Sequence, residues 1–139
     1  MDRILVALDA SPRAPLVLAA AVKLAKQTGS QLVLLRAVGI PPDLPHEIFE
    51  MTDARLEEVL LRNARQDLQR LTEGIPDVEV EAVFGTAWDT VCRTARERGV
   101  NLIVIGSHGY GGLDRVLGTT AAKVVNHADR NVLVVRTPL

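Results

Sequence analysis

Cysteine is nearly absent from this chain of 139 residues, which contains a single one, Cys92. One thiol cannot form a disulfide within the chain, so a disulfide-stabilised secreted scaffold is excluded and a reducing, cytoplasmic location is expected. The three histidines, His46, His108 and His127, are far apart, with no cysteine or carboxylate at ligand-like spacing. The sequence therefore does not predict a metal site built from protein side chains.

Aromatic residues and an excess of basic charge are also lacking. The aromatic residues are Phe49, Phe84, Trp88 and Tyr110, and 16 Lys and Arg against 17 Asp and Glu give a net charge of −1. A nucleic-acid-binding surface needs a basic excess, commonly with aromatic side chains for stacking. No apolar stretch approaches the roughly 18 residues of a membrane-spanning helix, and the first residues lack the apolar run of a signal peptide. We therefore expect neither nucleic-acid nor membrane partners.

Short apolar runs alternate with helical patterns along the chain. The first apolar run ends at Asp9, and Ser11 followed by Pro12 indicates a helix with Ser11 as N-cap, which Gly29 terminates. Residues 78–83 alternate apolar and charged side chains, which predicts an edge strand with one solvent-exposed face. The predicted strands cover residues 4–8, 31–38, 78–83, 101–105 and 132–135, and the later helices cover residues 56–71, 86–98 and 119–127.

Five strands that alternate with helices predict an α/β fold. We expect a single domain over residues 1–139, with three layers: a five-stranded, mainly parallel sheet and helices on both faces. Right-handed crossovers, the half-exposed third strand and the apolar first and fourth strands predict the strand order 3-2-1-4-5. Ligands bind such sheets where the winding direction reverses, at the carboxyl ends of the first and fourth strands. Asp9 and Gly106 stand at these two ends.

Glycine is concentrated after the fourth strand. Five glycines fall among the 13 residues from Gly106 to Gly118, where they would let backbone N–H groups approach an anion and adopt positive φ angles. Thr119 and Thr120 open the next helix, whose N-terminus favours a phosphate. No lysine follows these glycines as a P-loop requires, and the first crossover lacks the glycines of a dinucleotide-binding fold. The segment predicts phosphate binding, with a plain flexible turn as the alternative.

Four short motifs are typical of one family. They are the strand ending in Asp9 with Ser11 two residues later, the tetrapeptide from Gly106 to Gly109, the Gly118–Thr119 pair and the apolar run from Val132 to Val135. Over its whole length the chain resembles the universal stress protein family, in the branch that binds ATP. That family's pattern is Gly-x2-Gly-x9-Gly-Ser/Thr, whereas eight residues separate Gly109 from Gly118 here. The resemblance implies a parallel sheet of the adenine-nucleotide α-hydrolase kind and dimerisation through the last strand.

The same resemblance implies an adenine-nucleotide site, to which magnesium could come with ATP. Asp9 would lie near the ribose and adenine, and Ala37 would present its backbone to the adenine. The ribose and phosphates would be surrounded by Gly106, His108, Gly109, Gly118, Thr119 and Thr120. Structural explanations stay open, because Asp9 could complement the N-terminus of the first helix and His108, which we expect to be exposed, could face water.

Three other side chains have simpler structural explanations. Trp88 is expected to anchor its helix rather than stack on a ligand, and Cys92 to be a small, partly buried hydrophobe rather than a redox residue. His127 stands at a helix end, where it would complement the helix dipole.

The leading hypothesis for function is an ATP-binding stress-response protein. The nucleotide would select one arrangement of the glycine-rich loop for an unknown protein partner to read. The sequence shows no nucleophile–base pair or carboxylate cluster, so at most slow ATP hydrolysis is expected. The alternatives are an interaction module that no longer binds nucleotide, which the shorter loop favours, and an ATP-dependent enzyme of the same fold. Pairing of the apolar edge strand from Val132 to Val135 with a second copy predicts a homodimer.

Overall fold

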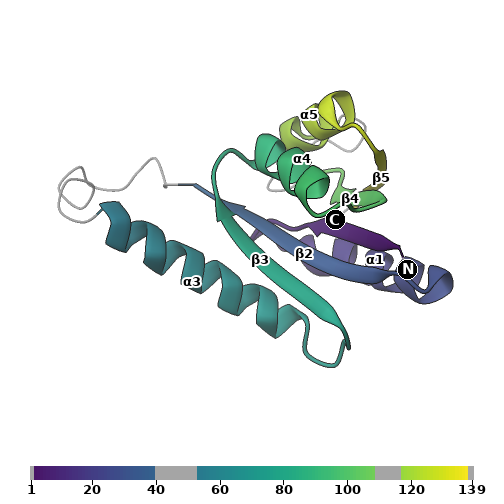
Figure 1. The fold of residues 1–139 in the computed structure, drawn as a ribbon, viewed down its shortest axis with the longest axis horizontal. Helices are drawn as coiled ribbons and strands as arrows, with labels where there is room; N and C mark the ends of the chain where they lie inside the picture. Colours follow the sequence, from purple (N-terminus) through teal and green to yellow (C-terminus); the bar gives the residue numbers. More distant parts are fainter. Residues whose placement is uncertain (1, 40–52, 109–116, 138–139) are drawn as a thin grey trace.

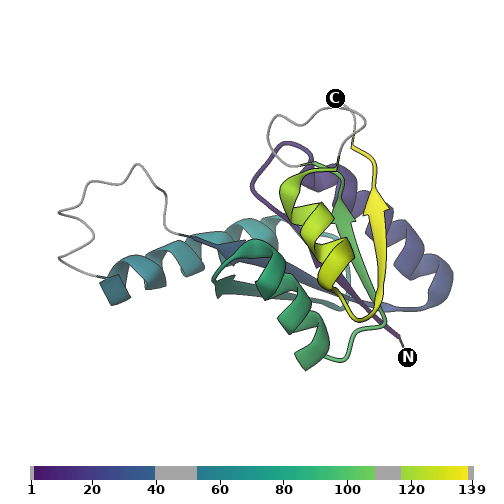
Figure 2. The same cartoon turned by 90° about the horizontal axis from the view of Figure 1, so that it is seen from above.

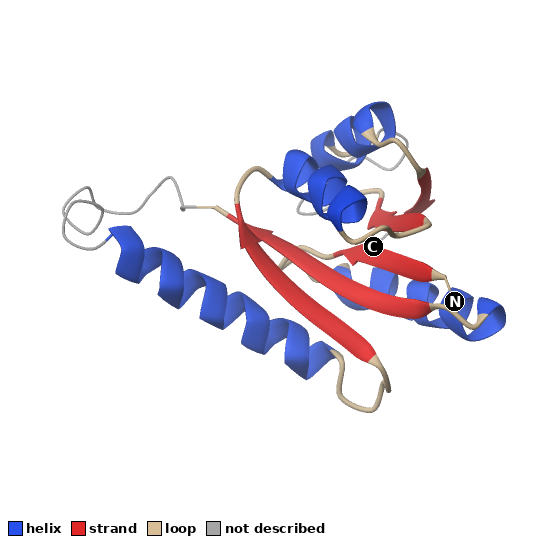
Figure 3. Ribbon diagram, in the orientation of Figure 1, coloured by secondary structure: helices blue, strands red, loops and turns tan. Residues whose placement is uncertain are grey.

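Strands and helices alternate along the protein in a computed structural model that describes residues 2–39, 53–108 and 117–137 (Figures 1 and 3). The strands are β1 (Arg3–Ala7), β2 (Gln31–Val38), β3 (Val78–Phe84), β4 (Leu102–Gly106) and β5 (Asn131–Val135). The helices are α1 (Ala14–Thr28), α3 (Asp53–Leu71), α4 (Ala87–Glu97) and α5 (Thr119–His127). Every predicted element is present, and the largest differences from the predicted bounds are at the starts of α1 and α3.

The five strands form one parallel sheet in the order β3-β2-β1-β4-β5, as predicted. β1 lies at the centre, where Val6 pairs with Leu34 of β2 on one side and with Val104 of β4 on the other. These three side chains are fully buried because helices cover both faces of the sheet. Figure 2 shows β4 and β5 side by side, both running away from the end of the molecule where β1 begins.

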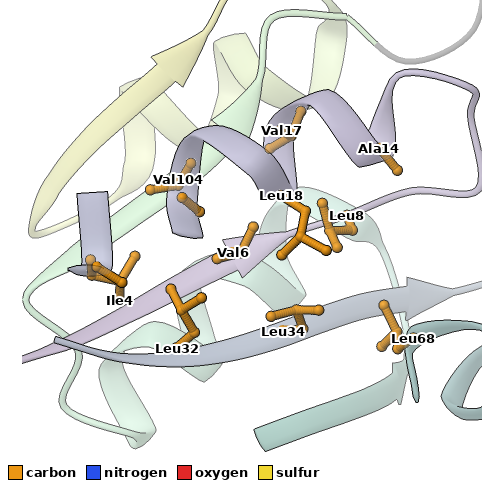
Figure 4. Packing of buried hydrophobic residues seen from close by; sticks show 12 residues of the cluster. Ile4, Val6, Leu8, Ala14, Val17, Leu18, Leu32, Leu34, Leu68 and Val104 are labelled. Atoms are coloured by element: carbon orange, nitrogen blue, oxygen red, sulfur yellow. The ribbon is translucent and has the colours of Figure 1, made fainter. Parts of the chain in front are cut away.

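Helices cover the two faces in pairs, so the sheet is the middle of three layers. Val17 and Leu18 of α1 and Leu68 of α3 pack on one face against Val6 and Leu34 (Figure 4). α4 and α5 pack on the other face through a second buried cluster. That cluster contains Leu5, Val33, Leu35, Val91, Cys92, Ala95, Val100, Ile103, Ile105, Ala121 and Val124. Within the described ranges, none of the helices has the length and apolar character needed to cross a membrane.

β3 is an edge strand, as predicted, and the face that carries its glutamates is half-buried rather than fully solvent-exposed. Glu79 and Glu81 lie on that face and accept hydrogen bonds from Arg98 after the end of α4, with Arg98 Nε 2.7 Å from Glu81 Oε2. Such partly exposed ion pairs contribute little to stability individually. Their charge nevertheless discourages this edge from pairing with other chains.

The start of α1 differs from the prediction. Arg13, rather than Ser11, is the N-cap residue, and Pro15, rather than Pro12, stands in the first turn. Ser11 Oγ instead accepts a hydrogen bond from Arg13 N at 3.2 Å, which closes a turn before the helix. The end of α1 is as predicted, because Gly29 adopts the left-handed conformation, with φ of 68°, that glycine favours.

Candidate functional site

A cavity of about 490 Å³ opens at the carboxyl end of the sheet, between the ends of β1 and β4. This is the point where the strand order reverses, and the volume is in the range of small-molecule sites. Seven of the residues predicted to bind nucleotide line it: Asp9, Ala37, Gly106, His108, Gly118, Thr119 and Thr120. Gly109 lies outside the described residues. The fold therefore brings the ends of three strands and the start of α5 to one cavity.

Much of the cavity wall is apolar. The strands contribute Leu35 and Ile105, α1 contributes Ala14 and Val17, and α4 contributes Val91. Helices from both outer layers reach the cavity because it lies beyond the strand ends, where the sheet no longer separates them. Such walls can bury a flat apolar ring, while the polar residues among them orient a ligand.

Asp9 lies in the connection between β1 and α1 and is held through both its side chain and its backbone. Its Oδ1 accepts a hydrogen bond from Ser11 N at 2.9 Å, and its backbone oxygen accepts one from Arg36 Nη2 at 3.2 Å. Arg36 Nη1 also donates to Asp67 Oδ2 of α3 at 3.3 Å. The Asp9 carboxylate thus caps the turn that precedes α1, and its exposed side chain remains at the cavity.

Gly106 and Gly118 serve close packing, and neither has the positive φ that we expected of this segment. A Cβ on Gly106 would lie 2.8 Å from Val17 Cγ2 of α1. Gly118 has φ of −61° and donates its N–H to Ser107 O at 2.7 Å, and a Cβ there would lie 3.2 Å from that oxygen. The Gly118–Ser107 bond joins the two ends of the glycine-rich segment beside the cavity.

Ser107, His108 and Thr137 form a buried polar cluster next to the cavity. Ser107 Oγ accepts a hydrogen bond from Thr137 N at 3.2 Å and lies 3.1 Å from His108 Nδ1. His108 is 9% exposed, so the expectation that it would be exposed was wrong. The hydroxyl of the adjacent Ser107 holds the ring inward, a contact that a glycine-rich sequence does not indicate.

The cluster contains a serine–histidine contact that the sequence interpretation did not consider. Ser107 and His108 are adjacent in the chain and lie within hydrogen-bond distance, and both line the cavity. The Ser107 side chain is 1% exposed and also binds the Thr137 backbone. Ser107 therefore links the end of β4 to the segment that follows β5.

Arg13 is a cavity residue that the sequence interpretation missed. Its side chain is buried, and Nε donates to Thr137 O at 2.9 Å. The signal available in the sequence was a cation at the start of a helix, where the dipole favours acidic residues instead.

The start of α5 provides anion-binding groups at the cavity. Its N-cap is Gly118, which has no side chain to bond the N–H groups of the first turn. Thr119 and Thr120 line the cavity at that turn. N–H groups at a helix start, together with two hydroxyls, suit a phosphate. Across the described residues, no three His, Cys, Asp or Glu side chains are grouped to hold a metal ion.

The three side chains with structural explanations lie outside the cavity lining, as expected. The ring centroids of Trp88 and His127 are 4.6 Å apart, which packs α4 against α5. His127 Nδ1 lies 2.8 Å from Lys123 O in the last turn of α5. Cys92 is buried in the core, and that burial raises the pKa of its thiol.

Comparison with known proteins identifies the family. The model of the universal stress protein family matches residues 1–136. Universal stress protein A homolog 1 of Coxiella burnetii is 30% identical over 135 residues, covering 95% of this chain and 94% of its own. The structure of the universal stress protein UspA from Lactobacillus plantarum has a TM-score of 0.72 at 30% identity and covers 97% of both chains. The Archaeoglobus fulgidus universal stress protein in complex with dAMP has the same fold, with a TM-score of 0.62 at 22% identity over 96% of this chain and 97% of its own. The chain described here belongs to the universal stress protein family.

Proposed function

We propose that the cavity binds an adenine nucleotide, with ATP as the ligand, and that the protein is a regulator rather than an efficient enzyme. The observation that carries this proposal is the cavity itself, about 490 Å³ in volume and placed where the strand order reverses. Seven residues that the family resemblance assigns to the nucleotide meet there, and Gly109 would be the eighth. The known structure of a universal stress protein with dAMP supports a ligand of this class.

The two ends of the nucleotide would meet different walls of the cavity. The adenine would lie by Ala37, where β2 and the apolar wall meet, with Asp9 near the ribose. Gly118, Thr119 and Thr120 would surround the phosphates, because the N-terminus of α5 offers N–H donors and the positive end of a helix dipole. Magnesium, if present, would come bound to the phosphates.

The glycine-rich segment is one residue shorter than the family pattern, with eight residues between Gly109 and Gly118. Its ends are nevertheless joined at the cavity by the bond from Gly118 N to Ser107 O. A length change between two fixed ends leaves the phosphate-binding groups at the start of α5 in place, which favours retained binding.

The nucleotide would act as a signal by stabilising one arrangement of this segment for a partner protein in the cytoplasm. Hydrolysis would be slow at most, with His108 or Asp9 able to orient a water. We also propose a homodimer through β5, from Val132 to Val135, because β5 is an edge strand and Leu133 on it is 40% exposed. An interaction module that has lost nucleotide binding is the second candidate, and the shorter loop is the observation that favours it.

The test combines nucleotide analysis with thermal unfolding. Nucleotide released by acid from the purified protein is identified, and the stripped protein is melted with ATP and magnesium or with GTP. Ligand at about 100 times its Kd stabilises a protein by about 2.7 kcal/mol, or roughly 5–10 °C at this chain length. We expect that shift with ATP and not with GTP.

A pair of variants tests whether the thermal shift with ATP depends on residues of the cavity. The double variant Thr119→Val/Thr120→Val removes two hydroxyls at the start of α5 and should greatly reduce the ATP shift. Thr28→Val, at the exposed end of α1, is the matched control and should keep it. Absence of both bound nucleotide and an ATP shift in the unaltered protein would reject the nucleotide site and favour the interaction module.

A further inference from the structure

Arg36 lies on the face of β2 that packs against α1 and α3, where a charged side chain is unfavourable. Leu32 and Leu34 precede it on that face and are buried in the core (Figure 4), so strand alternation predicts a third apolar residue at position 36. The Arg36 side chain is only 11% exposed. Its Nη1 donates to Asp67 Oδ2 at 3.3 Å, but its buried Nε has no hydrogen-bond acceptor among the residues that the structure describes. A nearly buried cation with an unsatisfied donor does not favour folding, so stability does not explain this arginine.

The same side chain bridges the place where β1 and β2 separate. β1 pairs with β2 as far as Ala7, whereas β2 continues beside β3 to Val38. Asp9, which follows β1, and Ala37, which belongs to β2, both line the cavity. Arg36 Nη2 donates to the backbone oxygen of Asp9 at 3.2 Å and so spans the separation. Because a guanidinium is planar and rigid, this bond fixes the distance of Asp9 from the end of β2.

We propose that Arg36 is a positioning residue of the nucleotide site, which holds the Asp9 carboxylate in place beside Ala37 for the ribose and adenine. This inference rests on the proposed function and deepens it. Arg36 does not line the cavity, so it acts through Asp9 and not by contact with the ligand. Asp67 of α3 balances the charge of Arg36 and thereby makes the outer helix a support of the site.

Replacement of Arg36 by methionine separates this role from a contribution to stability. Methionine keeps a long, flexible and apolar side chain on the buried face but cannot bind the Asp9 oxygen. No buried partner is left unpaired, because Asp9 is exposed and Asp67, which is half-exposed, keeps its ion pair with Arg70 at 2.8 Å. Apolar replacement of a buried ion pair is often neutral or stabilising. The urea midpoint of the unliganded Arg36→Met protein should therefore be unchanged or higher.

Nucleotide binding should weaken in the same variant. The measurement is the Kd of ATP and of adenosine by titration calorimetry or competition. A hydrogen bond to a charged group corresponds to about 10–100-fold in affinity, and a displaced Asp9 keeps part of it, so we expect about tenfold weaker binding. The factor should be the same for both ligands, because they share the ribose and adenine. Arg70→Met is the matched control: it removes the other partner of Asp67 at an exposed residue and should leave both Kd values unchanged.

A second background tests whether Arg36 acts through the Asp9 carboxylate. Asp9→Ala removes that carboxylate but keeps the backbone oxygen that Arg36 binds. The double variant Asp9→Ala/Arg36→Met should therefore bind ATP as well as Asp9→Ala does, since no carboxylate is left to misplace. Residues that act independently would instead give losses that add.

The outcomes distinguish this inference from the proposed function. If the unaltered protein binds neither ATP nor adenosine, the nucleotide site is wrong and the role of Arg36 with it. If the unaltered protein binds ATP, three results would leave the nucleotide site standing and overturn the positioning role: an unchanged Kd in Arg36→Met, a lowered urea midpoint alongside the weaker binding, or additive losses with Asp9→Ala. Weaker binding of both ligands by an equally stable protein, without additivity, supports it.

Discussion

Replacement of Gly106 by alanine is expected to destabilise the protein because the new methyl group would overlap with α1. The added Cβ would lie 2.8 Å from Val17 Cγ2, and Val17 is buried and β-branched, so its side chain would have to leave its preferred rotamer or shift with α1. An extra methyl group forced into a packed core costs about 1–3 kcal/mol. Alanine also gains about 0.4–1 kcal/mol from its less flexible unfolded chain, because Gly106 does not use positive φ. The unfavourable packing contribution is larger than this gain, so the free energy of unfolding should fall by about 1–2 kcal/mol.

Equilibrium unfolding in urea measures this loss, with Gly39→Ala as the matched control. A Cβ on Gly39 would meet nothing within 4 Å, so the control should be neutral or slightly stabilised. Val17→Ala tests the contact directly, since it removes the methyl group that Gly106→Ala would strike. The double variant Val17→Ala/Gly106→Ala should lose about 1 kcal/mol less unfolding free energy than the sum of the two single losses. Additive losses, or a Gly106→Ala protein as stable as the unaltered one, would refute the packing explanation of this glycine.

Three further predictions follow from buried and exposed side chains. Ser107→Ala leaves the buried N–H of Thr137 without its serine acceptor, so the free energy of unfolding measured in urea should fall by about 1–3 kcal/mol. A loss near zero would exclude a stabilising role for the Ser107–Thr137 hydrogen bond. Burial raises the pKa of the Cys92 thiol above its ordinary 9.0, so the folded state holds the proton more tightly and the stability that this group contributes is lost as pH rises above about 9. The free energy of unfolding of Cys92→Ala should therefore decrease less between pH 8 and 10 than that of the unaltered protein. An identical decrease would contradict the raised pKa. The unaltered protein should sediment as a dimer at micromolar concentration, and Leu133→Lys, which places a charge on the edge strand β5, should sediment as a monomer. A monomeric unaltered protein would count against the β5 interface.

The bond network around Arg36 indicates how the cavity is joined to the rest of the fold. Arg36 binds both the Asp9 backbone oxygen and Asp67 of α3, so a residue of the outer helix layer is connected to the loop after β1. Residues 40–52, between β2 and α3, lie outside the described residues. The described residues show that α3, which packs beside the edge strand, is connected through Arg36 to Asp9, a proposed nucleotide-binding residue.

The sequence by itself determined the strand order and the place of the cavity. Apolar runs such as residues 102–105 are stable only in strands covered on both faces, and the alternation at residues 78–83 is stable only at a half-exposed edge. With right-handed crossovers, these two facts favour the order 3-2-1-4-5, which puts Asp9 and Gly106 at neighbouring strand ends. Strand periodicity is a local property, so it can be recognised without knowledge of distant contacts.

Only the tertiary structure decided what the individual residues at that place do. Gly106 is required by Val17 of another layer, and Arg13 is held by Thr137, 124 positions along the chain. His108 contacts the hydroxyl of Ser107, which in turn accepts a hydrogen bond from the backbone of Thr137. Helix-start rules favoured Ser11 as N-cap, but Ser11 lies in the turn before the helix and Arg13 is the cap. Contacts between residues this far apart depend on how whole layers pack. Patterns within a few residues of sequence carry no record of that packing.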